Sequence, residues 1–515
     1  MVSDTKMTPL KSKGTLLWMW IAALAMASIG LAILFDASPG INWGIWTTLA
    51  GAGLLAFTRH TRGSVGATLI TTVVLACVIA FGAGVSANQM AYPLIVLSTG
   101  LLLAMAMLLS TDDRAERVKI SFMAWSPVIA GMRALIETVR RSGEGAELVL
   151  ARRSVPAVRG AALAVPVVLV FALLLANADP LFASLRDGIW ETIAQWVVVP
   201  KIVFFIVLLT IVLGAYGFAV RGAALETPTL DAPLFPALRL GDTERLIVIG
   251  SVASLFALFL ILQVSYLFGN APAVVGSGFT FAEHARRGFA ELTIVATLCA
   301  VLIIVLERYA ERGPRDALIR VVELVVVVEL VFLLVSAFRR VALYEAAYGF
   351  TTSRVYAQAY MHVMTVLLAL LGFEIRGGLN VGRLTRHAAL TGALAFVAML
   401  YWNHEGWIAE RDVGRYEKTG KLDEVYLTMD LSANALPAVV AALPRLGEET
   451  ANRIRVCLSD KYVGLQMLAS EDRWFELNHG RVGARQALAS AGINVIGKRR
   501  STQTGHCRVE NPAVG

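Results

Sequence analysis

Long apolar stretches recur along the chain and restrict its fold more than any other feature. A helix that crosses the hydrocarbon core of a bilayer needs roughly 17–25 predominantly apolar residues. Eleven stretches of the sequence approach or reach that length. They lie at about 15–35, 41–57, 66–83, 90–110, 160–177, 200–220, 246–268, 291–307, 321–337, 355–375 and 387–402. The sequence therefore predicts an all-α fold, a polytopic helical membrane bundle of about 11 spans.

The composition supports this class and excludes several others. Hydrophobic residues make up 57% of the 515 residues and charged residues only 16%, against roughly 45–50% and about 25% in ordinary soluble domains. So few polar residues cannot cover a water-soluble core of this size. The same figures exclude a disordered chain and a disulfide-rich scaffold. We expect no nucleic-acid partner, because no basic stretch is interleaved with aromatic residues.

The distribution of Lys and Arg predicts the orientation in the membrane. With a cytoplasmic N-terminus, the cytoplasmic segments carry 24 Lys and Arg and the opposite segments carry seven. Such an excess marks the cytoplasmic side. Eleven crossings then place the C-terminus outside the cytoplasm, although one span more or fewer would reverse that side. We expect a multi-pass protein of the bacterial inner (plasma) membrane.

Four parts follow from this pattern. Residues 1–110 form a four-span N-terminal membrane segment, and residues 111–159 form a cytoplasmic loop with an interfacial amphipathic helix near 122–141. That helix either docks a partner or serves as a connector on the bilayer surface. Residues 160–402 form a seven-span membrane core. Residues 403–515 have ordinary soluble composition and are predicted to form a small, mainly helical, extracytoplasmic domain.

The four cysteines fall into two groups. Cys77 and Cys299 lie in apolar spans, where cysteine behaves as a small hydrophobic residue. Cys457 and Cys507 lie in the C-terminal part and are a candidate disulfide if this part faces an oxidising compartment. Two free thiols are the alternative. The spacing of Cys and His gives no metal site, and we expect neither a metal nor a cofactor.

Ionisable residues inside the spans form a second candidate site. Glu323 and Glu329 lie in the ninth span and His362 in the tenth. Because an ionisable group in hydrocarbon needs a partner or water, such residues are candidates for a proton or cation pathway. Arg320 is placed to pair with Glu323 at the cytoplasmic boundary. The alternative is a set of interhelical hydrogen bonds that hold the bundle together.

Charged and aromatic residues also gather in the predicted outer loops, where positive charge is otherwise scarce. Arginines in these loops are expected to pair with a carboxylate or to bind an anionic ligand. Local pairs with Glu283, Glu291 and Glu345 are the simpler explanation. The candidate outer-face site comprises Glu283, Arg286, Arg287, Arg339, Arg340, Tyr344, Glu345, Tyr348 and Arg354.

Several of these segments carry a family resemblance over roughly residues 160–490. The motifs are Tyr-Leu-Phe-Gly at 266–269, Ala-Arg-Arg-Gly-Phe at 285–289, Tyr-Glu-Ala-Ala-Tyr-Gly-Phe-Thr at 344–351 and Asp-Pro-Leu-Phe at 179–182, with further matches between 403 and 432 and at Trp474 and Asn478. With these motifs the chain resembles the bacterial membrane family filed as domain of unknown function 4173. The resemblance implies no activity and therefore no catalytic residue.

No motif in the sequence indicates a reaction. It contains no Gly-rich phosphate-binding loop, no HExxH and no GxSxG. The leading interpretation is an envelope sensor or accessory protein with an extracytoplasmic site for a ligand or protein partner. One alternative is a proton- or cation-coupled secondary transporter. Another is a membrane enzyme that acts on a lipid-linked or envelope substrate, whose phosphate the outer arginines would hold. The bilayer is the expected partner in each case.

Overall fold

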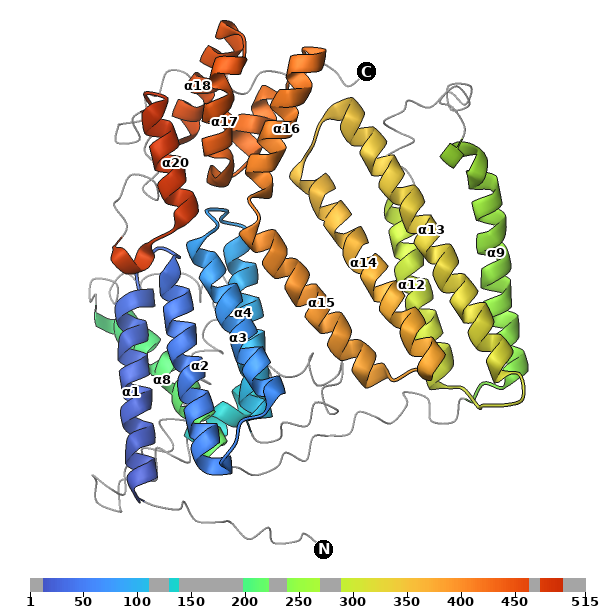
Figure 1. Cartoon of the computed structure of the whole chain (residues 1–515). Helices are drawn as coiled ribbons and strands as arrows, with labels where there is room; N and C mark the ends of the chain where they lie inside the picture. Colours follow the sequence, from blue (N-terminus) through green and yellow to red (C-terminus); the bar gives the residue numbers. More distant parts are fainter. Residues whose placement is uncertain are drawn as a thin grey trace, which may run out of the picture. The chain divides into compact units, whose positions relative to one another are not determined.

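The computed structural model describes residues 13–110, 129–138, 198–221, 239–268, 289–462 and 473–493. These ranges are all-helical and contain no strand (Figure 1). A single parallel bridge joins Leu240 to Ala310. The chain divides into two compact units, one built on residues 1–115, 122–227 and 471–479, the other on 116–121, 228–470 and 480–515.

The first unit contains a set of long helices with a short turn between the third and fourth. They are α1 (Lys13–Leu34), α2 (Ile41–Arg62), α3 (Ala67–Phe81), η1 (Gly82–Gly84), α4 (Ala91–Leu109) and α8 (Val198–Arg221). α2 approaches α8 closely at Gly53, where a Cβ would overlap the hydroxyl of Tyr216. That hydroxyl donates a hydrogen bond to the carbonyl of Ala50 (3.2 Å). Small residues permit such close helix contacts in membrane bundles.

Residues 129–138 are helical, inside the stretch where an interfacial amphipathic helix is predicted. Ala130 and Ala134 of this helix pack against α4 and α8, and Glu137 and Thr138 are buried as well. The larger apolar side chains of Met132 and Ile136 are exposed. The helix thus uses its alanines for packing against the bundle, and its bulky residues face outward.

A segment from the C-terminal part returns to the first unit. It contains η7 (Trp474–Glu476), followed by a fully buried Asn478. The Asn478 amide donates hydrogen bonds to the carbonyls of Ala83 (2.7 Å) and Ser86 (2.8 Å). Glu476 accepts a hydrogen bond from the backbone N–H of Ser38 (3.0 Å). The turns α1–α2 and α3–α4 are therefore tied to residues more than 390 positions later in the chain.

The second unit contains five long helices that run in alternating directions (Figure 1). They are α9 (Asp242–Phe268), α12 (Phe289–Arg308), α13 (Asp316–Tyr348), α14 (Thr352–Gly377) and α15 (Val381–Tyr401). α13 lies at the centre of their apolar core. Its Val326, Leu330 and Leu334 are at most 1% exposed, in a cluster with residues of α9, α12 and α14.

Shorter helical elements follow α15 in the same unit. They are α16 (His404–Thr419), η4 (Tyr426–Asp430), η5 (Ala433–Ala435), α17 (Leu436–Ala442), η6 (Leu443–Arg445), α18 (Glu448–Tyr462) and α20 (His479–Ser490). A small apolar core holds them together. Ile408, Ile454, Leu458 and Leu488 are each fully buried.

Within the described residues, seven helical stretches are long and apolar enough to cross a membrane: Gly14–Leu34, Ala67–Gly84, Ala91–Leu109, Pro200–Val220, Asp242–Leu262, Thr352–Gly377 and Val381–Tyr401. Each corresponds to one of the predicted spans. Three further predicted spans, 41–57, 291–307 and 321–337, lie within α2, α12 and α13 but outside this group of seven. The predicted span at 160–177 lies outside the described residues. The chain is therefore a membrane protein, and the count of about 11 stays a prediction.

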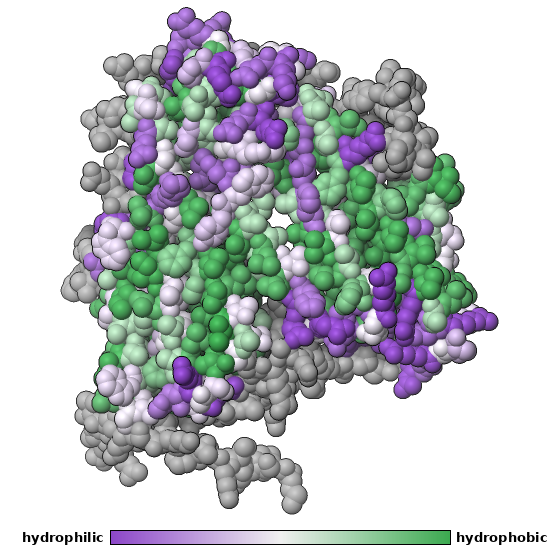
Figure 2. Space-filling model, viewed as in Figure 1, coloured by the Kyte–Doolittle hydropathy of each residue, from purple (hydrophilic) through white to green (hydrophobic). Residues whose placement is uncertain are grey.

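The surface of the second unit agrees with this assignment. Figure 2 shows that apolar residues cover the middle of its long helices, while hydrophilic residues gather at their two ends and over the shorter helices. α13 alone has 33 residues, which corresponds to about 50 Å at 1.5 Å per residue. A hydrocarbon core of roughly 30 Å therefore leaves part of this helix outside the apolar layer.

Candidate functional site

The turn between α13 and α14 is the centre of a set of buried polar contacts, here called the hairpin junction (residues 345–356 with 404–426). α13 ends at Gly349, whose φ of +86° lies in the left-handed region. A Cβ at this position would lie 2.7 Å from Asp412 Oδ1 and 3.0 Å from Arg415 Nη2. The conformation and the space both require glycine. Thr351 then caps α14 by accepting a hydrogen bond from the N–H of Arg354 (3.4 Å).

Asp412 of α16 binds directly to this turn. Its Oδ1 accepts a hydrogen bond from the backbone N–H of Phe350 (2.7 Å), and the residue is only 6% exposed. Burial raises the pKa of Asp412 to about 6, although the Phe350 N–H and the nearby Arg415 and Arg354 oppose this shift. Asp412 therefore changes its charge close to neutral pH.

Aromatic and imidazole groups extend the junction along α14 and α16. The hydroxyl of Tyr356 lies 3.1 Å from His404 Nε2, and His404 is 8% exposed. Trp407 packs edge-on against Phe350, with ring centroids 4.9 Å apart. The first turn of α16 is thereby fixed against the start of α14.

A third contact comes from the π-helical turn η4. The hydroxyl of Tyr426 accepts a hydrogen bond from the backbone N–H of Thr352 (2.7 Å). Burial raises the pKa of Tyr426, so its phenol stays neutral. Lys461 of α18 holds the same turn by donating hydrogen bonds to the carbonyls of Thr428 (3.0 Å), Met429 (2.8 Å) and Leu431 (2.7 Å). Burial lowers the pKa of Lys461 to about 8.

Part of the predicted outer-face site comes together at this junction. The guanidinium of Arg354 lies 4.0 Å above the ring of Tyr344, and Tyr344 contacts Tyr348 with ring centroids 5.0 Å apart. Glu345 is 4% exposed and accepts a hydrogen bond from the amide of Gln358 (2.7 Å). Stacking on an aromatic ring accounts for this arginine without a ligand. The amide satisfies Oε2 of Glu345, and the buried Oε1 has no hydrogen-bond partner.

The other predicted arginines do not form part of the junction. Arg339 is exposed, and Arg340 is half-buried and interacts electrostatically with Glu291 at the start of α12. Adjacent helix positions point in directions about 100° apart, which keeps these two guanidinium groups from sharing one pocket. Glu283, Arg286 and Arg287 lie outside the described residues.

The three residues of the predicted intramembrane pathway occupy different environments. Glu323 is fully buried and lies 3.6 Å from Arg245 of α9, whereas Arg320 bonds to Asp316 instead of Glu323 (2.6 Å). Glu329 is 9% exposed among apolar side chains, six positions further along α13. His362 is exposed and packs against Phe338 with ring centroids 4.6 Å apart. These environments give no continuous chain of polar groups.

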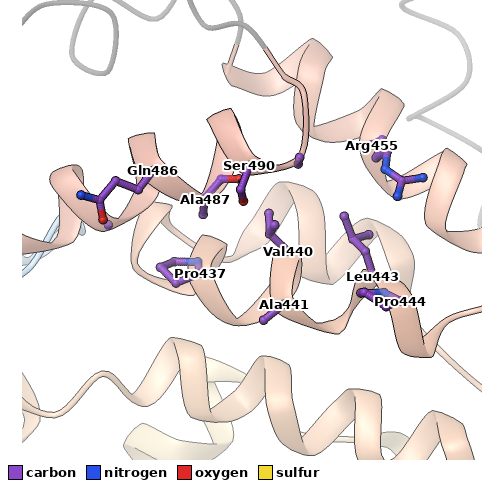
Figure 3. A pocket seen from close by; sticks show the side chains of 11 residues that line it. Pro437, Val440, Ala441, Leu443, Pro444, Arg455, Gln486, Ala487 and Ser490 are labelled. Carbon is purple, nitrogen blue, oxygen red and sulfur yellow. The ribbon is translucent and has the colours of Figure 1, made fainter.

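A surface groove lies beside the short helices, between α17, α18 and α20 (Figure 3). Its volume is about 520 Å³. Small and apolar residues line most of it, and polar side chains stand at its rim. The lining residues are Pro437, Val440, Ala441, Leu443, Pro444, Arg455, Gly483, Gln486, Ala487, Ser490 and Ala491. Among the residues in the described ranges, no three His, Cys, Asp or Glu side chains come together as metal ligands do.

The cysteines of the membrane helices and of the C-terminal helices are in different states. Cys77 and Cys299 are free thiols, and Cys457 of α18 takes part in a disulfide bond. Cys507, the partner that the sequence predicts for it, lies outside the described residues. The Cys457–Cys507 pairing therefore stays a prediction.

Sequence reasoning missed several of the residues that carry these contacts. Arg245 was counted only as a positive charge of a cytoplasmic loop, because the predicted span began at 246, whereas α9 begins at Asp242. Asp412 and Tyr426 lie in segments of ordinary soluble composition. The one local signal was Gly349, which follows a long helix and marks a turn.

Comparison with known proteins corrects the expected family. The family described as "Domain of unknown function (DUF4153)" matches residues 69–442. The four sequence motifs named for the resemblance to domain of unknown function 4173 lie inside this match, and Trp474 and Asn478 lie beyond it. The assignment to that family was wrong, because the matching family is a different one. No curated protein and no solved structure matches the chain. The match spans well over half of the sequence, and the chain therefore belongs to the DUF4153 family.

Proposed function

We propose that this protein is an envelope sensor or accessory protein of the bacterial inner membrane, whose C-terminal helices receive a protein partner outside the cytoplasm. The groove between α17, α18 and α20 is the observation that carries this proposal. It is open to a partner. Its helices α17 and α18 contact α16 and η4, which the hairpin junction attaches to the α13–α14 turn and to α14. A binding event on these helices is thus mechanically connected to the membrane helices.

The distribution of charge supports the orientation. Within the second unit, Arg312, Arg315, Arg376 and Arg383 lie at the helix ends opposite to the start of α16. Arginine gathers on the cytoplasmic side of membrane proteins, so this end belongs in the cytoplasm and α16–α20 belong outside. The disulfide bond of Cys457 is consistent with an oxidising compartment.

The lining of the groove favours a peptide segment of a partner as the bound group. Gly483 and Ala487 of α20 and Ala491 just beyond its end follow one another at intervals of four, and Pro437 and Ala441 line the same groove. Such small side chains let a partner backbone approach closely. Arg455 and Gln486 at the rim add hydrogen-bond donors (Figure 3), which suit an acidic residue of that segment.

The two alternative functions have less support. A proton or cation pathway through the spans needs polar groups within reach of one another, and Glu323, Glu329 and His362 occupy separate environments. An enzyme that grips phosphate needs convergent arginines, and Arg339 and Arg340 diverge. Docking of a partner requires neither arrangement.

Photo-crosslinking in living cells tests the docking surface. Ser490 lines the groove, whereas its neighbour Ala489 is equally exposed on α20 but does not line it. A photoreactive residue at 490 or at 486 is expected to give a discrete crosslinked product, and the same residue at 489 is not. Arg455→Glu should abolish the product at 490. Equal products at 489 and 490, or none at 490 and 486, would contradict the proposal.

A further inference from the structure

Three helix ends of the second unit meet at a fully buried arginine, Arg245 of α9. Its Nη1 donates a hydrogen bond to Asp316 of α13 (3.0 Å), and its Nη2 pairs with Glu307 of α12. The side chain of Arg245 has no exposed surface, and that of Glu307 is 5% exposed. Removing an arginine from water is expensive unless its hydrogen bonds are satisfied within the protein. Here two carboxylates bind Nη1 and Nη2, and Nε has no hydrogen-bond partner.

Glu323 of α13 is a third carboxylate at the same arginine and is poorly satisfied. Its Oε1 lies 3.6 Å from Arg245 Nη2, the same nitrogen that Glu307 binds. Its side chain is 0% exposed, and neither of its oxygens has a hydrogen-bond partner. Two carboxylates at one guanidinium nitrogen repel each other, and only Glu307 receives a hydrogen bond in return.

The charges around Glu323 do not balance when every group is ionised. Arg245 faces it from α9, Glu307 from α12, and Asp316 and Arg320 lie on its own helix. α14 also packs on this part of α13, but there it presents Gly372, next to Leu324 and Val327. Three carboxylates against two arginines leave one net negative charge in a buried site. A bound proton removes this charge at the lowest cost.

We propose that Glu323 and Glu307 share one proton, so that the meeting point of α9, α12 and α13 is a buried proton-binding site. The proton converts Glu323 into a neutral carboxylic acid and leaves Glu307 as the ionised partner of Arg245. Its loss places a second negative charge at Arg245 Nη2. The resulting repulsion acts between α12 and α13, the two helices that carry the carboxylates.

A graded exposure of the side chains provides a route for this proton. Glu323 is 0% exposed, Asp316 is 14% exposed and Arg320 is 30% exposed. Arg320 binds Asp316, which in turn binds Arg245. Because arginine does not release its proton, Asp316 is the group of this series that can take up a proton from the surface, at the arginine-rich end of the helices.

Infrared spectroscopy of the full chain in lipid nanodiscs tests the site. The carbonyl stretch of a protonated carboxyl is separate from the bands of carboxylates. At neutral pH, the difference spectrum obtained by subtracting Glu323→Gln from the wild type is expected to contain this band. Glu307→Gln should also remove it, because the remaining Glu323 then pairs with Arg245 as a carboxylate. Glu311→Gln is the matched control, since Glu311 pairs with Arg239 at the surface and its side chain is 55% exposed.

Each outcome decides the proposal. A band that is lost in both glutamate variants and kept in Glu311→Gln supports the shared proton. If one variant fails to fold, the other still makes the comparison. The proposal is overturned if the wild-type spectrum has no protonated-carboxyl band. It is also overturned if both variants keep a band as large as that of the wild type, because the cluster is then a fully ionised network.

Discussion

Replacing Arg245 by methionine is expected to lower the free energy of unfolding by about 3–5 kcal/mol, the usual cost of breaking a buried ion pair by removing one partner. Arg245 is the cation that joins α9 to both α12 and α13, through Glu307 and Asp316. Methionine keeps a long apolar side chain but leaves Glu307 without this donor and Asp316 with Arg320 alone. Thermal unfolding of the purified chain in detergent, followed by circular dichroism, measures the loss.

Arg239→Met provides the matched control for this effect. Arg239 also pairs with a glutamate of the α12–α13 region, Glu311, at 3.1 Å. Its side chain is 73% exposed, however, and exposed ion pairs contribute only about 0–1 kcal/mol. The Arg245 variant is expected to lose several times more unfolding free energy than the Arg239 variant. Similar losses in the two variants would show that the three-helix contact is not a main source of stability.

Asp412→Asn is expected to make the protein more stable at neutral pH and to flatten its response to acid. The pKa of Asp412 is raised to about 6 from its usual 3.8, so the folded chain holds the proton more tightly than the unfolded chain. The stability that the protonated carboxyl contributes is fully present below about pH 4 and is lost as the pH rises through about 6. At 1.36 kcal/mol per pKa unit, the wild type loses up to about 3 kcal/mol over this interval.

Unfolding midpoints measured across this pH range test the prediction. Asparagine keeps an oxygen that accepts the Phe350 N–H but cannot ionise, so the variant should lack the decline. Asp423→Asn is the control, because Asp423 also accepts one backbone N–H, from Tyr426 (2.9 Å), while being exposed. It should keep the decline but move it to slightly lower pH, because the charge of Asp423 repels the ionised Asp412 and so helps to raise its pKa. A decline of equal size in Asp412→Asn would show that another group carries the pH response.

Apolar length and periodicity were sufficient to predict the helices. The stretches at 15–35, 66–83 and 355–375 coincide with α1, α3 and α14 because a span needs about 20 apolar residues. Helix ends were predicted less well. The first turn of α9 carries Arg245 and α13 begins with Asp316, two charged residues of a buried cluster, and a search for apolar residues stops before them.

The contacts that organise the candidate site could not be predicted from one sequence. Arg245 and Asp316 are 71 positions apart and Phe350 and Asp412 are 62 positions apart. No local pattern links such residues, because their pairing depends on how whole helices align. The sequence showed that Glu323 was a polar group inside a span, which is a local property. Its partner on another helix became known only from the packing of α9 against α13.

The most direct test of the proposed function is the side of the membrane on which α16–α20 lie. Three helices, α13, α14 and α15, separate Pro314 from Gly447, and both residues are exposed. Single cysteines at these positions, in a background in which all four native cysteines are replaced by serine, can be labelled in spheroplasts with a membrane-impermeant maleimide. Gly447→Cys is expected to react in intact spheroplasts, and Pro314→Cys only after permeabilisation. Labelling of Pro314→Cys alone in intact spheroplasts would contradict the extracytoplasmic display of these helices.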